Sequence, residues 1–192
     1  LKWQGLYIFG PLTRLFPVIL DDAYGKVAFC PLPYAEPARV RVMMNTLGLK
    51  GADQVHSYEE AEMVLSRYLL SLLPAEPLRK VALAHAFAAG GTPSESERPL
   101  SIGGYDRISD AVFEGYDYTA LGHLHRPQKT QKESEKIQYS GSLMRHSLDE
   151  VNQKKGVIVG ELDKEGKVHT TFHEMVPRYQ VRCMEGAFHT LM

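Results

Sequence analysis

The alternation of apolar and polar residues is clearest between residues 57 and 72, where it has the period of a helix. Apolar side chains recur there at spacings of three and four, which places them on one helical face. Ser57-Tyr-Glu-Glu60 precedes them and has the sequence of a capping box, in which each end residue can bond the backbone N–H of the other. The pattern predicts a capped helix that buries its apolar stripe. A shorter helix is expected over residues 37–47.

Shorter apolar stretches predict strands. Residues 16–20 and 26–32 flank a turn composition and predict a hairpin. Residues 80–85 and 118–122 do not alternate, so we expect both strands to be buried on both faces. Residues 86–104 form a long loop, which in a compact domain is often functional. The other expected elements are strands at 5–9, 137–142, 156–162 and 167–174, a short helix at 109–116 and the start of a strand at 177–183.

The composition narrows the function classes. The 192 residues carry 22 basic and 23 acidic side chains, so a nucleic-acid contact would need a local basic patch. Cys30 and Cys183 lie far apart and predict reduced thiols in a cytoplasmic protein. No apolar run approaches the roughly 18 residues that cross a bilayer, so no membrane association is expected. The chain opens on Leu1 rather than Met, which suggests that it was cut from something longer.

Three histidines follow the two buried strands. His85 closes one of them, and His123 and His125 come directly after the other. In extended backbone, residues two apart point to the same side, and Gly122 leaves room beside them. Binding sites of α/β sheets lie at the carboxyl ends of strands, and imidazole suits Zn, Mn, Fe or Co. The arrangement predicts a metal site.

Two other interpretations of the same histidines stay open. They can form a mononuclear zinc site with water as the fourth ligand, or they can be structural residues of a non-catalytic interaction module. A dinuclear hydrolytic site also needs carboxylates. Asp117 lies at the wrong end of its strand, and Glu95 and Glu97 are expected to be solvated loop residues. The remaining ligands are therefore expected from outside this sequence.

The stretch Tyr118-Thr-Ala-Leu-Gly-His-Leu-His-Arg-Pro-Gln128 resembles the GHxH motif of the calcineurin-like metallophosphoesterases, and within them the SbcD-type nuclease subunits. Other stretches match the family in order and approximate spacing, so that the resemblance covers roughly residues 5–183. These stretches are residues 27–34, 81–85, 94–98, 102–104, 113–117 and 139–142.

The resemblance implies an α/β (α+β) fold, part of a four-layer αββα sandwich with mixed β-sheets. Residues 1–176 would be the carboxyl-terminal portion of the nuclease domain, and 177–192 a linker and the start of a DNA-capping domain. It also implies phosphodiester hydrolysis of DNA in repair and recombination, with two Mn ions or, alternatively, Zn, Fe or Mg. An SbcC-type ATPase would be the partner, and the complete protein would form a homodimer.

The resemblance assigns the histidines individually. His85 and His123 would bind the second metal ion, and His125 the first. The family's Asp-x-His, Gly-Asp and Gly-Asn-His-Asp motifs are absent, and Leu143 stands where a proline is common. Because these motifs would supply the bridging carboxylate and the other ligands, we expect weak metal binding and little nuclease activity from this chain alone.

Four further residues are candidates near the histidines. Arg126 and Lys129 belong to a basic run that could contact DNA phosphates, although a solvated loop explains them as well. Ser140 and Ser142 could orient the ligands, or they could simply form a turn. The remaining histidines are expected to be surface or structural residues: His56, His146, His169, His173 and His189.

Overall fold

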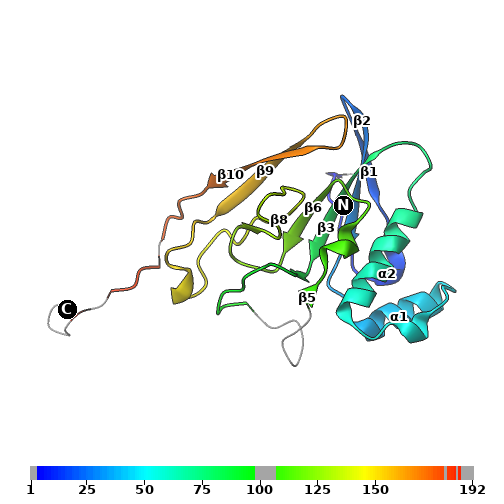
Figure 1. Ribbon diagram of the computed structural model, residues 1–192, viewed down its shortest axis with the longest axis horizontal. Helices are drawn as coiled ribbons and strands as arrows, with labels where there is room; N and C mark the ends of the chain where they lie inside the picture. Colours follow the sequence, from blue (N-terminus) through cyan, green and yellow to red (C-terminus); the bar gives the residue numbers. More distant parts are fainter. Residues whose placement is uncertain (1–3, 98–106, 180, 185, 187–192) are drawn as a thin grey trace.

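A six-stranded mixed sheet forms the centre of the computed structural model, which describes residues 4–97, 107–179, 181–184 and 186 (Figure 1). Four neighbouring strands run parallel, and the outermost strand on each side is antiparallel to its neighbour. In spatial order the strands are β1 (Val18–Asp22), β2 (Gly25–Leu32), β3 (Arg79–His85), β6 (Tyr118–Gly122), β8 (Ile137–Tyr139) and β7 (Gln128–Lys129). The predicted mixed α/β sheet is confirmed.

Two helices cover one face of this sheet, α1 (Pro37–Thr46) and α2 (Tyr58–Ser71). The capping box of α2 forms as predicted, because Ser57 Oγ accepts from Glu60 N at 3.2 Å and Glu60 Oε2 accepts from Ser57 N at 2.9 Å. The stripe of α2 packs on strand residues that point the same way, and together they form the core. Fully buried members are Cys30, Leu32, Val40, Leu65, Leu69, Ala82 and Tyr139.

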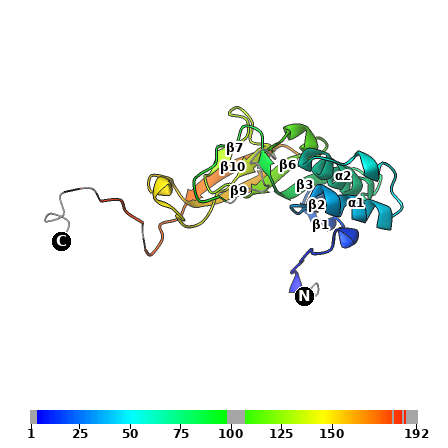
Figure 2. The same ribbon diagram turned by 90° about the horizontal axis from the view of Figure 1, so that it is seen from below.

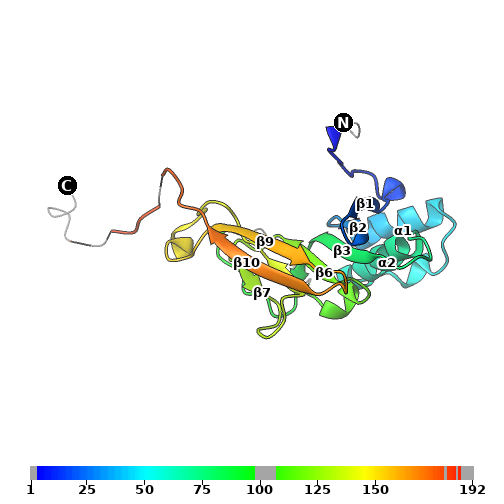
Figure 3. The same ribbon diagram turned by 90° about the horizontal axis from the view of Figure 1, so that it is seen from above.

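The opposite face of the sheet is only partly covered. A separate hairpin of β9 (Gly156–Leu162) and β10 (Val168–Glu174) lies against it, and together they line a cavity of about 430 Å³. Figure 3 shows this hairpin and the helices in separate parts of the molecule. Leu83, in the middle of β3, keeps 46% of its surface exposed. The prediction that this strand is buried on both faces is therefore wrong, and the two-stranded β9–β10 hairpin covers this face of the sheet only in part.

Several local predictions also need correction. Residues 5–9 form no strand, and the predicted helix at 109–116 is a single 3₁₀ turn, η4 (Asp110–Phe113). The described residues of 177–183 contain no strand, and the chain after β10 leads away from the sheet (Figure 2). The expected long loop contains β4 (Phe87–Ala88), which pairs with β5 (Arg107–Ile108). Residues 102–104 and His189 lie outside the described residues.

The remaining features of the fold are the two cysteines, the lengths of the helices and the short 3₁₀ turns. Cys30 is a buried free thiol and Cys183 an exposed one. No helix within the described ranges is both long enough and apolar enough to cross a membrane. The other 3₁₀ turns are η2 (Leu12–Arg14), η3 (Ala52–Gln54) and η5 (Leu148–Glu150), and the last of these belongs to the candidate site.

Candidate metal centre

His85 and His123 meet at the carboxyl ends of two neighbouring strands. β3 and β6 are parallel, and their register pairs His85 with Gly122, the last residue of β6. The two rings lie 5.3 Å apart between centroids, at 68° to each other. A Cβ on Gly122 would stand 3.4 Å from His85 Nδ1, so a glycine there keeps the space beside the ring open. Parallel pairing thus brings together two imidazole rings that are 38 residues apart in the chain.

The chain bends sharply at His123, whose φ is 113°. Among the described residues that are not glycine, it alone has a positive φ. Such backbone is strained for a side chain with a Cβ, and strain of this kind concentrates at functional sites. The expectation of extended backbone over 123–125 is wrong. As a consequence, His123 faces His85 while His125 has a different set of neighbours.

The surroundings of both His85 and His123 favour the neutral form of the imidazole ring. Burial lowers the pKa of His85. Burial, together with the charges that His85 and His125 can carry, lowers the pKa of His123 to about 4. Both rings are therefore neutral at neutral pH, which is the form of imidazole that a metal ion requires.

His125 lies in a cluster of polar side chains. Its Nδ1 is 2.9 Å from Glu150 Oε1 and 2.8 Å from Ser96 Oγ, and its ring centroid is 4.8 Å from that of His146. Its backbone N–H donates to Glu97 Oε1 at 2.6 Å. Glu97, which was expected to be a solvated loop residue, is therefore a hydrogen-bond partner of His125. His146 lies next to the His125 ring.

Two oppositely charged side chains lie buried behind His125. Glu150 is 0% exposed and Lys155 is 1% exposed, and Lys155 Nζ lies 2.9 Å from Glu150 Oε2. Burial by itself raises the pKa of Glu150, but bonds from Ser96, the His146 backbone, Lys155 and His125 outweigh it and lower the pKa to about 2. The carboxylate is therefore charged and fully partnered.

The turn at 140–142 holds the backbone of His125. Its carbonyl accepts from Ser142 N at 3.0 Å and from Lys155 Nζ at 2.8 Å. A Cβ on Gly141 would stand 2.6 Å from the same oxygen, and Gly141 has a φ of 78°, so this close approach requires glycine. Lys155 also donates to Ser142 Oγ at 3.0 Å. Ser140, in contrast, lines the cavity on the open face of the sheet.

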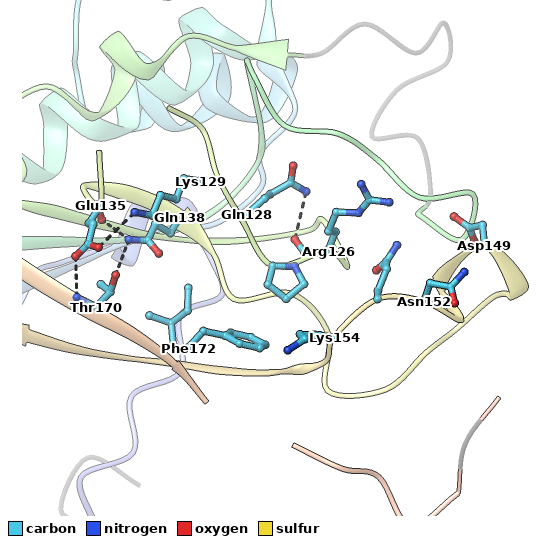
Figure 4. Close-up of a pocket in the computed structure, with 13 residues that line it drawn as sticks. Arg126, Gln128, Lys129, Glu135, Gln138, Asp149, Asn152, Lys154, Thr170 and Phe172 are labelled. Atoms are coloured by element: carbon cyan, nitrogen blue, oxygen red, sulfur yellow. Dashed lines mark hydrogen bonds and ion pairs between the residues drawn. The ribbon is translucent and has the colours of Figure 1, made fainter. Parts of the chain in front are cut away.

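Arg126 and Lys129 line a second cavity of about 800 Å³, between the segment that contains β7 and β8 and the β9–β10 hairpin (Figure 4). Arg126 is exposed, and Lys129 Nζ lies 3.3 Å from Glu135 Oε1. Phe172 contributes an apolar wall and Lys154 a further cation, which is paired with Glu174 at 3.1 Å. The cavity is thus mixed in charge, and Arg126 is one of its exposed cations.

The described residues contain no group of three or more His, Cys, Asp and Glu side chains placed to hold one metal ion. His85, His123 and His125 therefore do not form the mononuclear three-histidine zinc site, since His125 faces Glu150 instead. The arrangement separates one pair of neutral imidazoles from one carboxylate-bound imidazole. The two sets of imidazoles therefore have different surroundings, and neither set has three of these side chains around one point in the described part of the chain.

Comparison with known proteins supports the resemblance found in the sequence. The chain is 29% identical over 166 residues to the D subunit of the SbcCD nuclease of Staphylococcus epidermidis. It resembles an SbcD-type nuclease subunit. The aligned part covers 86% of this chain and 42% of that relative's length. No protein-family model matches the chain.

Proposed function

We propose that this chain carries part of the two-metal site of an SbcD-type DNA nuclease. His85 and His123 would bind one ion, and His125 would bind the other. The observation that carries the proposal is the pair of neutral imidazoles 5.3 Å apart at the ends of two parallel strands. The similarity to the D subunit of the SbcCD nuclease supports the same assignment.

The residues present fit such ions in their chemistry. Neutral imidazole is an ordinary ligand of Mn, Zn and Fe, and the Nδ1 of His125 is held by a carboxylate, as in many metal-binding histidines. Two manganese ions are the proposed cofactor, with Zn, Fe or Mg as the other candidates. Bound ions of this kind offset phosphate charge and activate water for attack on a phosphodiester. The bridging carboxylate is not among the described residues of this centre.

The substrate proposed from the resemblance is DNA. Arg126 lies directly after His125 and is exposed at the cavity of Figure 4, where it is placed to contact a backbone phosphate. Lys129 lines the same cavity and would first have to leave Glu135, at 3.3 Å. Arg126 is therefore the stronger phosphate contact of the two. Ser142 would act indirectly, through the backbone carbonyl of His125.

The wider assembly follows from the same proposal. Further strands would join the β9–β10 hairpin on the open face around Leu83 and complete the αββα sandwich. Residues 1–176 would belong to the nuclease domain, and 177–192 would lead into a DNA-capping domain. An SbcC-type ATPase would be the partner, and the complete protein would form a homodimer.

Metal titration of the chain tests the assignment. Manganese binding can be followed by electron paramagnetic resonance, and zinc binding by calorimetry. We expect weak binding that falls at least tenfold in His85→Ala and in His123→Ala. His169→Ala, on exposed β10, serves as the matched control and should bind as the parent does.

Three outcomes would contradict the proposal in different ways. Unchanged metal content in both variants, with only stability altered, would favour an interaction module with structural histidines. One stoichiometric tetrahedral zinc ion with no second ion would favour the mononuclear site. Robust DNA hydrolysis by the chain alone, free of contaminating nuclease, would show that the site is already complete and not a part.

A further inference from the structure

The polar cluster behind His125 is built like a support for that ring. Glu150 comes from η5 and Lys155 from the residue before β9, and both side chains are fully buried. Burying two charges is costly unless they are paired and hydrogen-bonded on every side. Here the chain brings both of them to His125, from 25 and 30 residues further along.

The hydrogen bonds of Glu150 fix their own directions, because an ionised carboxylate can only accept. Oε2 accepts from Lys155 Nζ at 2.9 Å and from the His146 backbone N–H at 3.0 Å. Oε1 accepts from the Ser96 hydroxyl and from His125 Nδ1, the latter at 2.9 Å. Both oxygens are thus occupied by two donors each.

The tautomer of His125 follows from this arrangement. The single proton of the Ser96 hydroxyl points to Glu150, so its oxygen is left as an acceptor for His125 Nδ1 at 2.8 Å. Two acceptors then face Nδ1, which must carry the ring proton. In a neutral ring Nε2 is consequently unprotonated, and its lone pair is available to a metal ion.

We propose that Glu150 is a positioning residue for His125, which holds the ring as the Nδ1–H tautomer and leaves Nε2 free as a metal ligand. Lys155 keeps Glu150 ionised and oriented in its buried place. The tautomer depends only on contacts within this chain. The role of Nε2 toward an ion rests on the function proposed above.

The variant Glu150→Gln gives a sharp test, because it keeps the shape but replaces one oxygen by a donor. Lys155 and the His146 backbone both require an acceptor, so the amide oxygen of the variant would take the place of Oε2. Its NH₂ group would then point at Ser96 and His125 Nδ1. To avoid two facing donors, the ring would move its proton to Nε2, where it blocks metal binding.

The tautomers can be measured without any metal, from ¹⁵N shifts and long-range ¹H–¹⁵N couplings of histidine-labelled protein at pH 8.5. We expect Nδ1–H for His125 in the parent and in the control Asp149→Asn, whose exposed carboxylate neighbours Glu150. We expect Nε2–H in Glu150→Gln. In a parallel titration with manganese or zinc alone, that variant should bind 10- to 100-fold more weakly than the parent.

An Nε2–H tautomer in the parent, or an unchanged Nδ1–H tautomer in Glu150→Gln, would overturn the proposal. If Glu150→Gln fails to fold, the double variant Glu150→Gln/Lys155→Met removes the unpaired buried charge. It keeps the His146 N–H as the donor that orients the amide, so the same tautomer change is expected. If the tautomers behave as stated but the parent binds no ion, the support by Glu150 stands and the proposed metal function fails.

Discussion

Two buried carboxylates in this molecule have opposite fates. Glu62, on the buried side of α2, is 2% exposed, and its Oε2 has no hydrogen-bond partner among the described residues. Burial raises its pKa to about 8. Glu150 is just as buried, yet its four donors lower its pKa to about 2. Both side chains are shielded from solvent, and the hydrogen-bond partners of Glu150 are what keep its carboxylate charged.

The difference separates a packing region from the candidate site around His125. The helical side of the sheet is an apolar core in which Glu62 is accommodated as a neutral acid. In the region of residues 140–155, in contrast, Glu150 and Lys155 are charged. Glu150 is hydrogen-bonded to the ring of His125, and Lys155 to its backbone carbonyl. Fully satisfied buried networks of this kind fix a single geometry, which the proposed role of His125 as a metal ligand would require.

The largest expected effect comes from breaking the charged pair. Lys155→Met would leave Glu150 buried and without its cation, and should reduce the free energy of unfolding by about 3–5 kcal/mol. Urea unfolding followed by circular dichroism measures the loss. Adding Glu150→Gln to this variant should recover part of it. If Lys155→Met lowers the free energy of unfolding by less than about 1 kcal/mol, the pair is more exposed to water than the structure shows.

The backbone tie of the same region gives the next prediction. Gly141→Ala puts a side chain on a left-handed residue and brings its Cβ within 2.6 Å of the His125 carbonyl oxygen. Gly48→Ala is the matched control, because Gly48 also has a positive φ, of 69°, but no atom within 4 Å of the added Cβ. We expect a loss of about 1 kcal/mol in the control and about 2–4 kcal/mol in Gly141→Ala. Equal losses in chemical unfolding would show that the turn does not support His125.

The sequence was sufficient for the elements that depend on local pattern. The period of three and four gave α2, Ser57 and Glu60 gave its cap, and the turn compositions gave both hairpins. It also placed His85 and His123 at neighbouring strand ends, because the carboxyl ends of parallel strands share one edge.

The support of His125 could not be predicted in the same way. Glu150 lies in a polar stretch without period, and its contact with His125 depends on how residues 140–155 fold back. The bend at His123 could not be located from the sequence either, since a φ of 113° is rare for any residue other than glycine. The open face around Leu83 was not predicted, because a strand of apolar residues indicates burial on both faces but does not say which part of the protein covers each face.

Glu62 provides a prediction with a definite pH dependence. Its folded pKa of about 8 lies above the usual carboxyl range, so the unfolded chain releases this proton first as the pH rises. The parent therefore loses stability between about pH 5 and 8, by at most 1.4 kcal/mol per pH unit. Glu62→Gln should remove this slope and gain on the order of 2 kcal/mol at pH 7. Glu133→Gln, at an exposed carboxyl, is the control in the same urea series, and an equal pH slope in parent and Glu62→Gln would refute the assignment.

The smallest effect should come from the residue next to the buried lysine. Lys154 pairs with Glu174 at 3.1 Å, but the side chains are 74% and 47% exposed, so water screens their attraction. Lys154→Met should change the free energy of unfolding by less than about 0.5 kcal/mol. Because it is the same substitution one position away from Lys155→Met, the pair isolates burial from the chemistry of the side chain. Similar losses of unfolding free energy at both positions would mean that the contribution of Lys155 to stability does not come from its burial beside Glu150.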